Sequence, residues 1–465
     1  MDTPGSDEKS LLGDGTHTES LLNGNDNGLH GGNAGTSSHD RLVVQCESDV
    51  SYEKGSEHHQ QHKQHWMFSA FMTVGYILGT GVLVLPSAMS QLGYVLGSIT
   101  CIIFAILSTY IGLLLGRLRN DFHPDCLSYK MLARKCVGIE FEYALEFLTC
   151  INWFMTMALY ILTAVEAFQA AFSIELCGYY WGLICLALLT PCMFIQTMKS
   201  MEWMAAISDA AAILIIILVL ALIASEDGDL PSDHKHNVWP KNSDFLTSYN
   251  PISSFLFAYQ GQSIFLEVMS EMKNPREWPK SVYFSHTLMA SAYGITAVVG
   301  YYYKGNDVPA YLPSGLKDGP AKTVVNLLVA YHVLVAYIIN NVPLAAMLKR
   351  RYMKGAQTSL TNHFALSFSM LVGAWMLTNL IPFFKDMVSI IGALCGSPIM
   401  IGLPPLFYYY ALKERGRTMG KVDLVVCSFL FFLLFPFTFG AGMASAFDSL
   451  IQNWKKNGPP FTCKK

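Results

Sequence analysis

Two glycine-centred stretches of this chain can offer backbone hydrogen-bonding groups to a ligand. Glycine tolerates unusual dihedral angles and lets a ligand approach the main chain closely. Where a helix is interrupted, free N–H groups suit a carboxylate, and free carbonyls at a helix C-terminus suit an ammonium group. Two such interruptions can therefore hold both ends of an α-amino acid without a charged side chain. The candidate residues are Gly79, Thr80 and Gly81 in the first stretch and Tyr259, Gln260 and Gly261 in the second.

Both stretches lie inside long apolar runs. The chain is 52% hydrophobic and only 14% charged, whereas a soluble protein has about 25% charged residues. From Trp66 onward, apolar runs of about 20 residues recur, the length that crosses a bilayer. We therefore predict an all-α polytopic membrane protein with eleven transmembrane helices. They lie near 67–91, 94–116, 143–171, 178–197, 204–224, 251–270, 282–303, 323–348, 364–383, 386–411 and 422–447.

The two glycine-centred stretches fall in the first and the sixth of these runs. Many secondary transporters contain inverted repeats with interrupted helices at corresponding positions. Eleven segments divide into five, five and one, and an odd repeat length inverts the second copy. Unwound backbone costs several kcal/mol per unpaired group in lipid, so it survives where it lines a cavity. The alternative for the first stretch is helix packing, because Gly75 and Gly79 form a GxxxG pattern.

The membrane segments account for one domain, 66–450, between two tails. Residues 1–65 are polar, lack apolar periodicity and are expected to be disordered. Lys and Arg gather in alternate loops, most clearly at 273–280 and 349–354. Positive loops mark the cytoplasmic side, which places the N-terminus in the cytoplasm and the short tail 451–465 on the other side.

The bulk composition and the tail carry further expectations. A net charge of −3 does not indicate a nucleic acid partner. The eleven cysteines show no metal-ligand spacing, and those in apolar runs are expected to be small packing residues. Within the tail, Asp7 to Leu12 fits an acidic dileucine signal for a sorting adaptor. Two locations stay open: the plasma membrane, or an endosomal, lysosomal or vacuolar membrane.

The sequence resembles the amino acid/auxin permease family, within the amino acid–polyamine–organocation superfamily. The resemblance rests on GTGVLVLPSAM in the first segment and FLFAYQGQSIFLEVMSEMKNPREWPKSV in the sixth, and it covers about 66–450. It implies the fold of the bacterial leucine transporter, with a five-plus-five inverted repeat and alternating access. By this resemblance Gly79, Thr80 and Gly81 face the substrate carboxylate. Tyr259, Gln260 and Gly261 line the amine and side-chain pocket.

The expected coupling ion is a proton, with sodium less favoured. The sodium-coupled branch has Asn where this chain has Gly75, so an oxygen ligand is missing there. Charged side chains inside membranes are rare and usually functional. Candidate coupling residues are Glu166 and His332, the second because imidazole titrates near neutrality. The alternatives are a vestibule carboxylate for Glu166 and a hydrogen-bonded core histidine for His332.

Other polar residues of the membrane segments have structural expectations. Asp209 and Glu267 are expected to be interfacial anchors. Asn340, Asn341 and Pro343 mark a polar, kink-prone point in the segment 323–348, which is expected either to line the cavity or to hydrogen-bond between helices. No soluble catalytic domain or cluster of catalytic residues is present, so an enzyme is not expected, and neither is a metal or an organic cofactor.

The sequence thus predicts a secondary active transporter of amino acids. Neither break contains a charged residue, which favours neutral substrates. Two alternatives remain: a transporter-like amino acid sensor, and a carrier of an amino-acid-like molecule such as auxin.

Overall fold

The long apolar runs form helices, because a helix pairs its internal backbone groups within itself and none is left unpaired in lipid. The computed structural model describes residues 64–172, 174, 176–196, 202–226, 235–240, 245–352 and 359–461. Within those ranges, eight helices are long and apolar enough to cross a membrane, and two shorter apolar helices accompany them. The chain is therefore an all-helical, multi-pass membrane protein. The predictions for the tail up to residue 63, the sorting signal included, lie outside the described residues.

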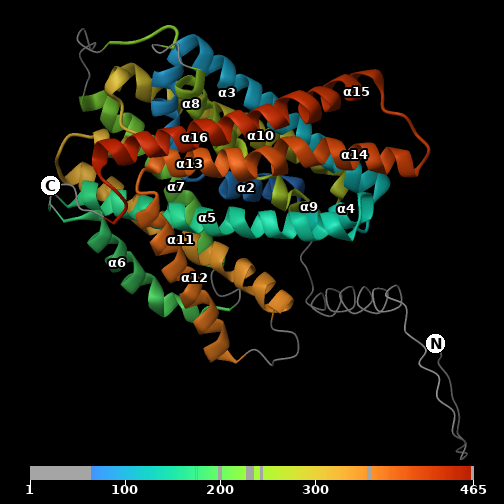
Figure 1. Cartoon of the computed structure of the whole chain (residues 1–465), viewed down its shortest axis with the longest axis horizontal. Helices are drawn as coiled ribbons and strands as arrows, with labels where there is room; N and C mark the ends of the chain where they lie inside the picture. Colours follow the sequence, from blue (N-terminus) through green and yellow to red (C-terminus); the bar gives the residue numbers. More distant parts are fainter. Residues whose placement is uncertain are drawn as a thin grey trace, which may run out of the picture. The chain divides into compact units, whose positions relative to one another are not determined.

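Figure 1 shows the order of the helices along the chain. The first half contains α2 (Trp66–Ile77), α3 (Leu85–Arg117), α4 (Tyr129–Cys136), α5 (Ile139–Ala171), α6 (Gly178–Leu189) and α7 (Glu202–Glu226). The second half contains α8 (Phe245–Tyr259), α9 (Phe265–Glu271), α10 (Trp278–Lys304), α11 (Pro320–Tyr352), α12 (Leu360–Leu380), α13 (Phe384–Ile391), α14 (Leu403–Glu414), α15 (Lys421–Ser428) and α16 (Phe435–Asn457).

Two helix pairs distant in sequence dominate the packing: α3 lies along α10, and α5 lies along α11. Glycines on α3 make the first pairing close. A methyl group added at Gly116 would come within 2.4 Å of the indole of Trp278. The same indole donates a hydrogen bond to the carbonyl of Gly112 over 2.9 Å. Small residues of this kind let helix backbones approach each other in membranes.

Irregular backbone also occurs away from the predicted breaks. Gly93 in α3 has φ of 75°, and it lies between the first and second predicted segments. A side chain there would come within 2.7 Å of the carbonyl oxygen of Val238, so glycine is required. Between α13 and α14, Gly392–Gly402 forms a π-helix. π-Helical turns are frequent at functional sites, and Ile399 from this one reaches the cavity described below.

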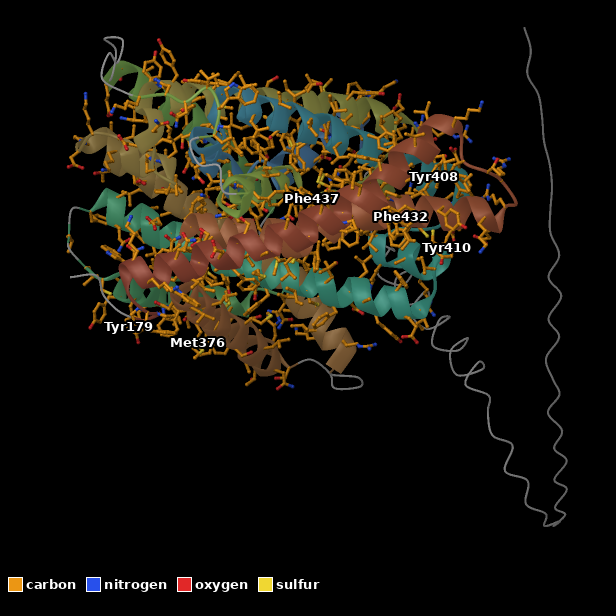
Figure 2. All side chains as sticks on the ribbon, turned by 45° about the horizontal axis from the view of Figure 1, so that its top comes forward. Tyr179, Met376, Tyr408, Tyr410, Phe432 and Phe437 are labelled. Carbon is orange, nitrogen blue, oxygen red and sulfur yellow. The ribbon has the colours of Figure 1, made fainter. Side chains whose placement is uncertain are left out.

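Large apolar side chains point outward around the bundle, as lipid contact requires. Phe432 is 75% exposed and Met376 is 52% exposed, and Figure 2 shows both on the outside of their helices. These side chains are therefore placed to contact lipid and not a neighbouring helix.

The cysteines of the apolar runs are unpaired, as predicted. Cys177 is different, because it is disulfide-bonded and precedes α6. Disulfides persist in oxidising compartments and not in the cytosol. The free cysteines among the described residues are Cys101, Cys126, Cys136, Cys150, Cys185, Cys192, Cys395 and Cys427.

Candidate functional site

The first predicted break is present between α2 and α3. Helix α2 ends at Ile77, and Gly79 follows in a non-helical conformation with φ of −123° and ψ of −142°. A short 3₁₀ turn, Thr80–Val84, then leads into α3. The chain has no complete α-helical path through this point, so backbone groups at both helix ends are free to meet a ligand.

The second predicted break lies between α8 and α9. Helix α8 ends at Tyr259, and a 3₁₀ turn at Gln262–Ile264 precedes α9. Gln260 and Gly261 form the unwound link between them. Both interrupted segments that the sequence indicated are therefore found in the structure.

Glycines let the two breaks touch. A methyl group added at Gly261 would come within 2.4 Å of Ile77 Cγ1, at the end of α2. One added at Gly81 would come within 3.0 Å of Ala258 Cα, at the end of α8. Each break thus presents a glycine to the last turn of the other broken helix. The close crossing accounts for Gly81 and Gly261, whereas a Cβ at Gly79 would meet nothing within 4 Å, so Gly79 is not needed for a close helix contact.

A cavity of about 60 Å³ lies where the breaks meet. It receives residues from both broken helices and from α5, α11 and the π-helix. None of the described residues that line it carries a charge. The lining residues are Tyr76, Ile77, Gly79, Thr80, Gly81, Asn152, Trp153, Thr156, Tyr160, Phe257, Ala258, Gln260, Gly261, Ser263, Asn340 and Ile399.

Of the six predicted site residues, Tyr259 is the one that does not line this cavity. Its side chain is fully buried, and its hydroxyl lies 3.4 Å from the thiol of Cys101. The other five line the cavity, and Asn340 joins them from α11. Their direct contact with a substrate stays a prediction.

Helix α5 supplies polar groups that the sequence reasoning missed. Asn152 is 8% exposed, and its Oδ1 atom has no hydrogen-bond partner among the described residues. An unpaired buried oxygen at a cavity wall indicates a place for a donor from a ligand or water. On the same wall, the Trp153 indole N–H donates to the Tyr76 hydroxyl over 3.2 Å. Polar side chains in the third segment were the available signal.

A buried hydrogen-bond network supports the second break from behind. The amide nitrogen of Gln262 donates to Ser108 Oγ over 2.9 Å, while its oxygen accepts from the Gly261 N–H. Ser108 Oγ also lies 3.0 Å from Nε2 of His286, which is 2% exposed. Helices α3 and α10 thereby fix the unwound backbone. His286 was not among the predicted site residues, because a histidine in a helix gives no sign of its partners.

A second, smaller cavity of about 20 Å³ adjoins the first break. It lies between that break, α7 and α11. Gly79 and Thr80 line both cavities, so the unwound stretch separates them. The lining residues are Leu78, Gly79, Thr80, Val82, Leu83, Ala212, Ile215, Ile216, Val329, His332 and Val333.

His332 is the single titratable side chain of this smaller cavity. Its Nδ1 lies 3.0 Å from the carbonyl oxygen of Ser208, which can only accept a hydrogen bond, and 2.9 Å from Ser208 Oγ. The hydrogen therefore sits on Nδ1 in the neutral ring, and Nε2 keeps a lone pair. No described residue donates to Nε2. His332 is therefore hydrogen-bonded in the core and also faces a cavity, and its coupling role stays a prediction.

Asp209 supplies an oxygen at the position where the sequence suggested that one is missing. A methyl group added at Gly75 would come within 2.6 Å of Asp209 Oδ2. The carboxylate from α7 thus occupies the space that a larger residue at 75 would take. The absence of Asn at this position consequently does not leave the first segment without a side-chain oxygen, although that oxygen comes from another helix.

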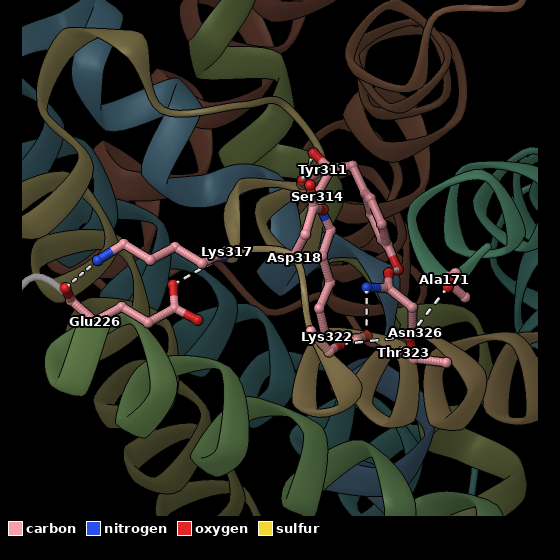
Figure 3. Close-up of polar contacts among 10 residues, drawn as sticks. Ala171, Glu226, Tyr311, Ser314, Lys317, Asp318, Lys322, Thr323 and Asn326 are labelled. Carbon is pink, nitrogen blue, oxygen red and sulfur yellow. Dashed lines mark hydrogen bonds and ion pairs between the residues drawn. The ribbon is translucent and has the colours of Figure 1, made fainter. Parts of the chain in front are cut away.

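Glu166 lies away from both cavities, near the end of α5. The connection between α10 and α11 packs over this end (Figure 3). Thr323 donates to the carbonyl of Ala171 over 3.1 Å, and the Tyr311 hydroxyl donates to Asn326 over 2.8 Å. Burial, together with the charge of Glu166, raises the pKa of Tyr311 well above its ordinary value. Glu267, by contrast, is exposed on α9.

No group of three metal-ligating side chains occurs among the described residues.

Residues 62–445 match the model of the transmembrane amino acid transporter protein family. The chain belongs to this family, whose members are transporters and not enzymes.

Curated relatives are consistent with this assignment. The N amino acid transport system protein of Neurospora crassa is 23% identical over 89% of this chain and 91% of its own length. Lysine histidine transporter-like 3 of Arabidopsis thaliana is 21% identical over 86% of this chain and 91% of its own. A vesicular inhibitory amino acid transporter of Xenopus tropicalis is 23% identical over 73% and 69%.

Among solved structures, a Na⁺-coupled sialic acid symporter in a substrate-bound, outward-open state is similar in fold. The TM-score is 0.50 at 10% identity, over 86% of this chain and 92% of that chain. The chain therefore has a transporter fold.

Proposed function

We propose that this protein is a secondary active transporter that moves neutral amino acids across a membrane by alternating access. The observation that carries the proposal is the meeting of two helix breaks at one uncharged cavity, with Gly81 and Gly261 crossing. Its architecture would be the eleven-helix, five-plus-five inverted repeat expected from the sequence.

The cavity suits the two ends of an amino acid. Backbone N–H groups that begin at Thr80, where a new helical stretch starts, suit the carboxylate. The carbonyl ends of α2 and α8 and the free Oδ1 of Asn152 suit the ammonium group. Gln260 and Asn340 offer neutral amides to the side chain. An amino acid with a charged side chain would find no opposite charge in the lining.

The proposed coupling ion is the proton, and the proposed site is Nε2 of His332. The smaller cavity is lined mainly by hydrocarbon, whereas Na⁺ needs several oxygen ligands. A proton on Nε2 would place a positive charge beside the unwound Gly79–Thr80 backbone, which also lines the substrate cavity. Asp209 follows Ser208, the hydrogen-bond partner of His332, on α7. Glu166, near the C-terminal end of α5, is a second candidate for the coupling residue.

The proposed orientation has the N-terminus in the cytoplasm. The disulfide at Cys177 supports it, because the loop before α6 then faces an oxidising compartment. The plasma membrane and an acidic organelle membrane both meet this condition. Fluorescence microscopy of the full chain, with and without Leu11→Ala and Leu12→Ala in the adaptor signal, would distinguish them.

Purified protein in proteoliposomes tests the function directly. We expect uptake of radiolabelled L-alanine, L-glutamine or L-leucine, faster with an imposed pH gradient and independent of Na⁺. Absence of both uptake and counterflow for all amino acids, auxin and polyamines would exclude transport. Uptake that requires Na⁺ and ignores the pH gradient would exclude proton coupling alone.

A further inference from the structure

Tyr293, on α10, joins the two breaks through one hydroxyl group. The hydroxyl lies 3.0 Å from the carbonyl oxygen of Ile77 and 2.9 Å from that of Ala258. These carbonyls belong to the last turns of α2 and α8, where the helices end at the breaks. The side chain of Tyr293 is fully buried. A residue from a third, unbroken helix therefore contacts both discontinuous helices at once.

The hydrogen count makes this contact unusual. A tyrosine hydroxyl carries one hydrogen, and a backbone carbonyl can only accept. The hydroxyl can consequently donate to one of the two carbonyls at a time, and the other keeps a free lone pair. Ile77 also accepts from the N–H of Gly79 over 2.9 Å. Both residues line the substrate cavity, and the carbonyl that Tyr293 leaves without a proton can accept from a second donor.

We propose that Tyr293 is a positioning residue that holds the carbonyls of Ile77 and Ala258 together for the ammonium group of the substrate. This inference rests on the proposed transport of amino acids. The ammonium group carries three hydrogens, so it supplies the donors that the shared hydroxyl lacks. Binding of the substrate then satisfies both breaks together, which links the movement of α2 to that of α8.

The ring of Tyr293 has a separate packing role, which allows a clean substitution. Its centroid lies 4.9 Å from that of Tyr259, edge to face. Tyr293→Phe keeps this ring contact and removes the hydroxyl alone. Tyr337→Phe is the matched control, because Tyr337 on α11 is equally buried and its hydroxyl has no hydrogen-bond partner among the described residues.

The experiment compares uptake kinetics of these variants in proteoliposomes, with whichever of L-alanine, L-glutamine and L-leucine the wild type transports. We expect Tyr293→Phe to raise KM about tenfold, the effect of one buried hydrogen bond, and to change Vmax less than twofold. Inhibition by L-lactate, in which a hydroxyl replaces the ammonium group of alanine, should change less than threefold. Tyr337→Phe should behave as wild type.

A second variant tests whether the number of donor hydrogens matters, and it separates a lost hydrogen bond from a folding defect. Tyr293→4-aminophenylalanine carries two N–H donors, one for each carbonyl, and should restore KM to within threefold of wild type. The inference is overturned by a KM of Tyr293→Phe equal to wild type, by an equal defect in Tyr337→Phe, or by a 4-amino variant that folds and stays as impaired as Phe. Loss of wild-type uptake itself would instead overturn the proposed function.

Discussion

Gly261 in the second break lies directly against Ile77 at the end of the first, so that a methyl group on Gly261 would come within 2.4 Å of Ile77 Cγ1. A methyl group on its counterpart Gly81 would likewise come within 3.0 Å of Ala258 Cα. The crossing of the two broken helices therefore depends on two missing side chains, one from each break. Substituting either glycine should separate the breaks.

Gly81→Leu should abolish amino acid uptake, with at least a tenfold fall in rate. The leucine would wedge against α8, and overpacking of this kind costs about 1–3 kcal/mol. Gly440→Leu is the control, because nothing lies within 4 Å of a Cβ at this exposed position of α16. Uptake per molecule in proteoliposomes decides the matter, and normal uptake by Gly81→Leu would place the site elsewhere.

Gly75→Ala should lower the melting temperature, because the methyl group meets the Asp209 carboxylate. We expect a loss of about 1–3 kcal/mol in stability. Gly75→Ala combined with Asp209→Ala should recover part of the loss, since the obstacle is removed. Thermal unfolding in detergent measures both, with Gly440→Ala as the neutral comparison. A Gly75→Ala variant as stable as wild type would show that Asp209 swings away freely.

His332→Gln should remove the stimulation of uptake by a pH gradient while leaving counterflow of labelled amino acid in place. The amide can still hydrogen-bond to Ser208 but cannot gain a proton. Glu166→Gln tests the second candidate in the same assay, and Asp209→Asn tests the carboxylate that follows Ser208, the hydrogen-bond partner of His332. Retained pH stimulation in His332→Gln, with loss in Glu166→Gln, would move the coupling site to the far end of α5.

His123, in the loop after the second segment, should make the fold sensitive to acid. Burial lowers its pKa below 6.5, although Glu414 at 3.8 Å opposes the shift. The unfolded chain therefore binds the proton first, and stability falls as the pH drops below about 6.5. His123→Gln should flatten the loss of melting temperature between about pH 7.5 and pH 5, within the range set by that reference value.

Substitution of Glu414, the ion-pair partner of His123, should shift the acid sensitivity in the opposite direction. Glu414→Gln removes the group that raises the histidine pKa, so the acid-induced loss should continue to lower pH than in wild type. Identical pH profiles for wild type and both variants would mean that the protonation of His123 does not differ between the folded and unfolded states.

The breaks could be predicted because glycine and proline act locally. Gly79, Gly81 and Gly261 lower the cost of unwound backbone at these points, and the matching positions of the two glycine-centred stretches, five segments apart, separated breaks from ordinary helix packing. The long apolar helices were equally accessible, since length and hydropathy are properties of a single segment.

The cavity wall on α5 and the residues that support the two breaks could not be predicted in the same way. Asn152, Ser108, Tyr293 and His286 lie in the middle of helices, and their roles depend on which helix face meets which neighbour. That information comes from packing between segments far apart in sequence. Asp209 shows the same limit, because its proximity to Gly75 joins two helices that the sequence separates by more than 100 residues.

The first described residue of the chain has its own connection to the second break. The N–H of Gln64 donates to the carbonyl of Glu271, and its carbonyl accepts from the N–H of Lys273, each over 2.8 Å. Main-chain pairing of this kind fastens the start of α2 to the end of α9. A shift of α9 would therefore move the start of α2 as well. A substrate that moves the second break would thus act on both ends of α2, at Gln64 through this pairing and at Ile77 through Gly261.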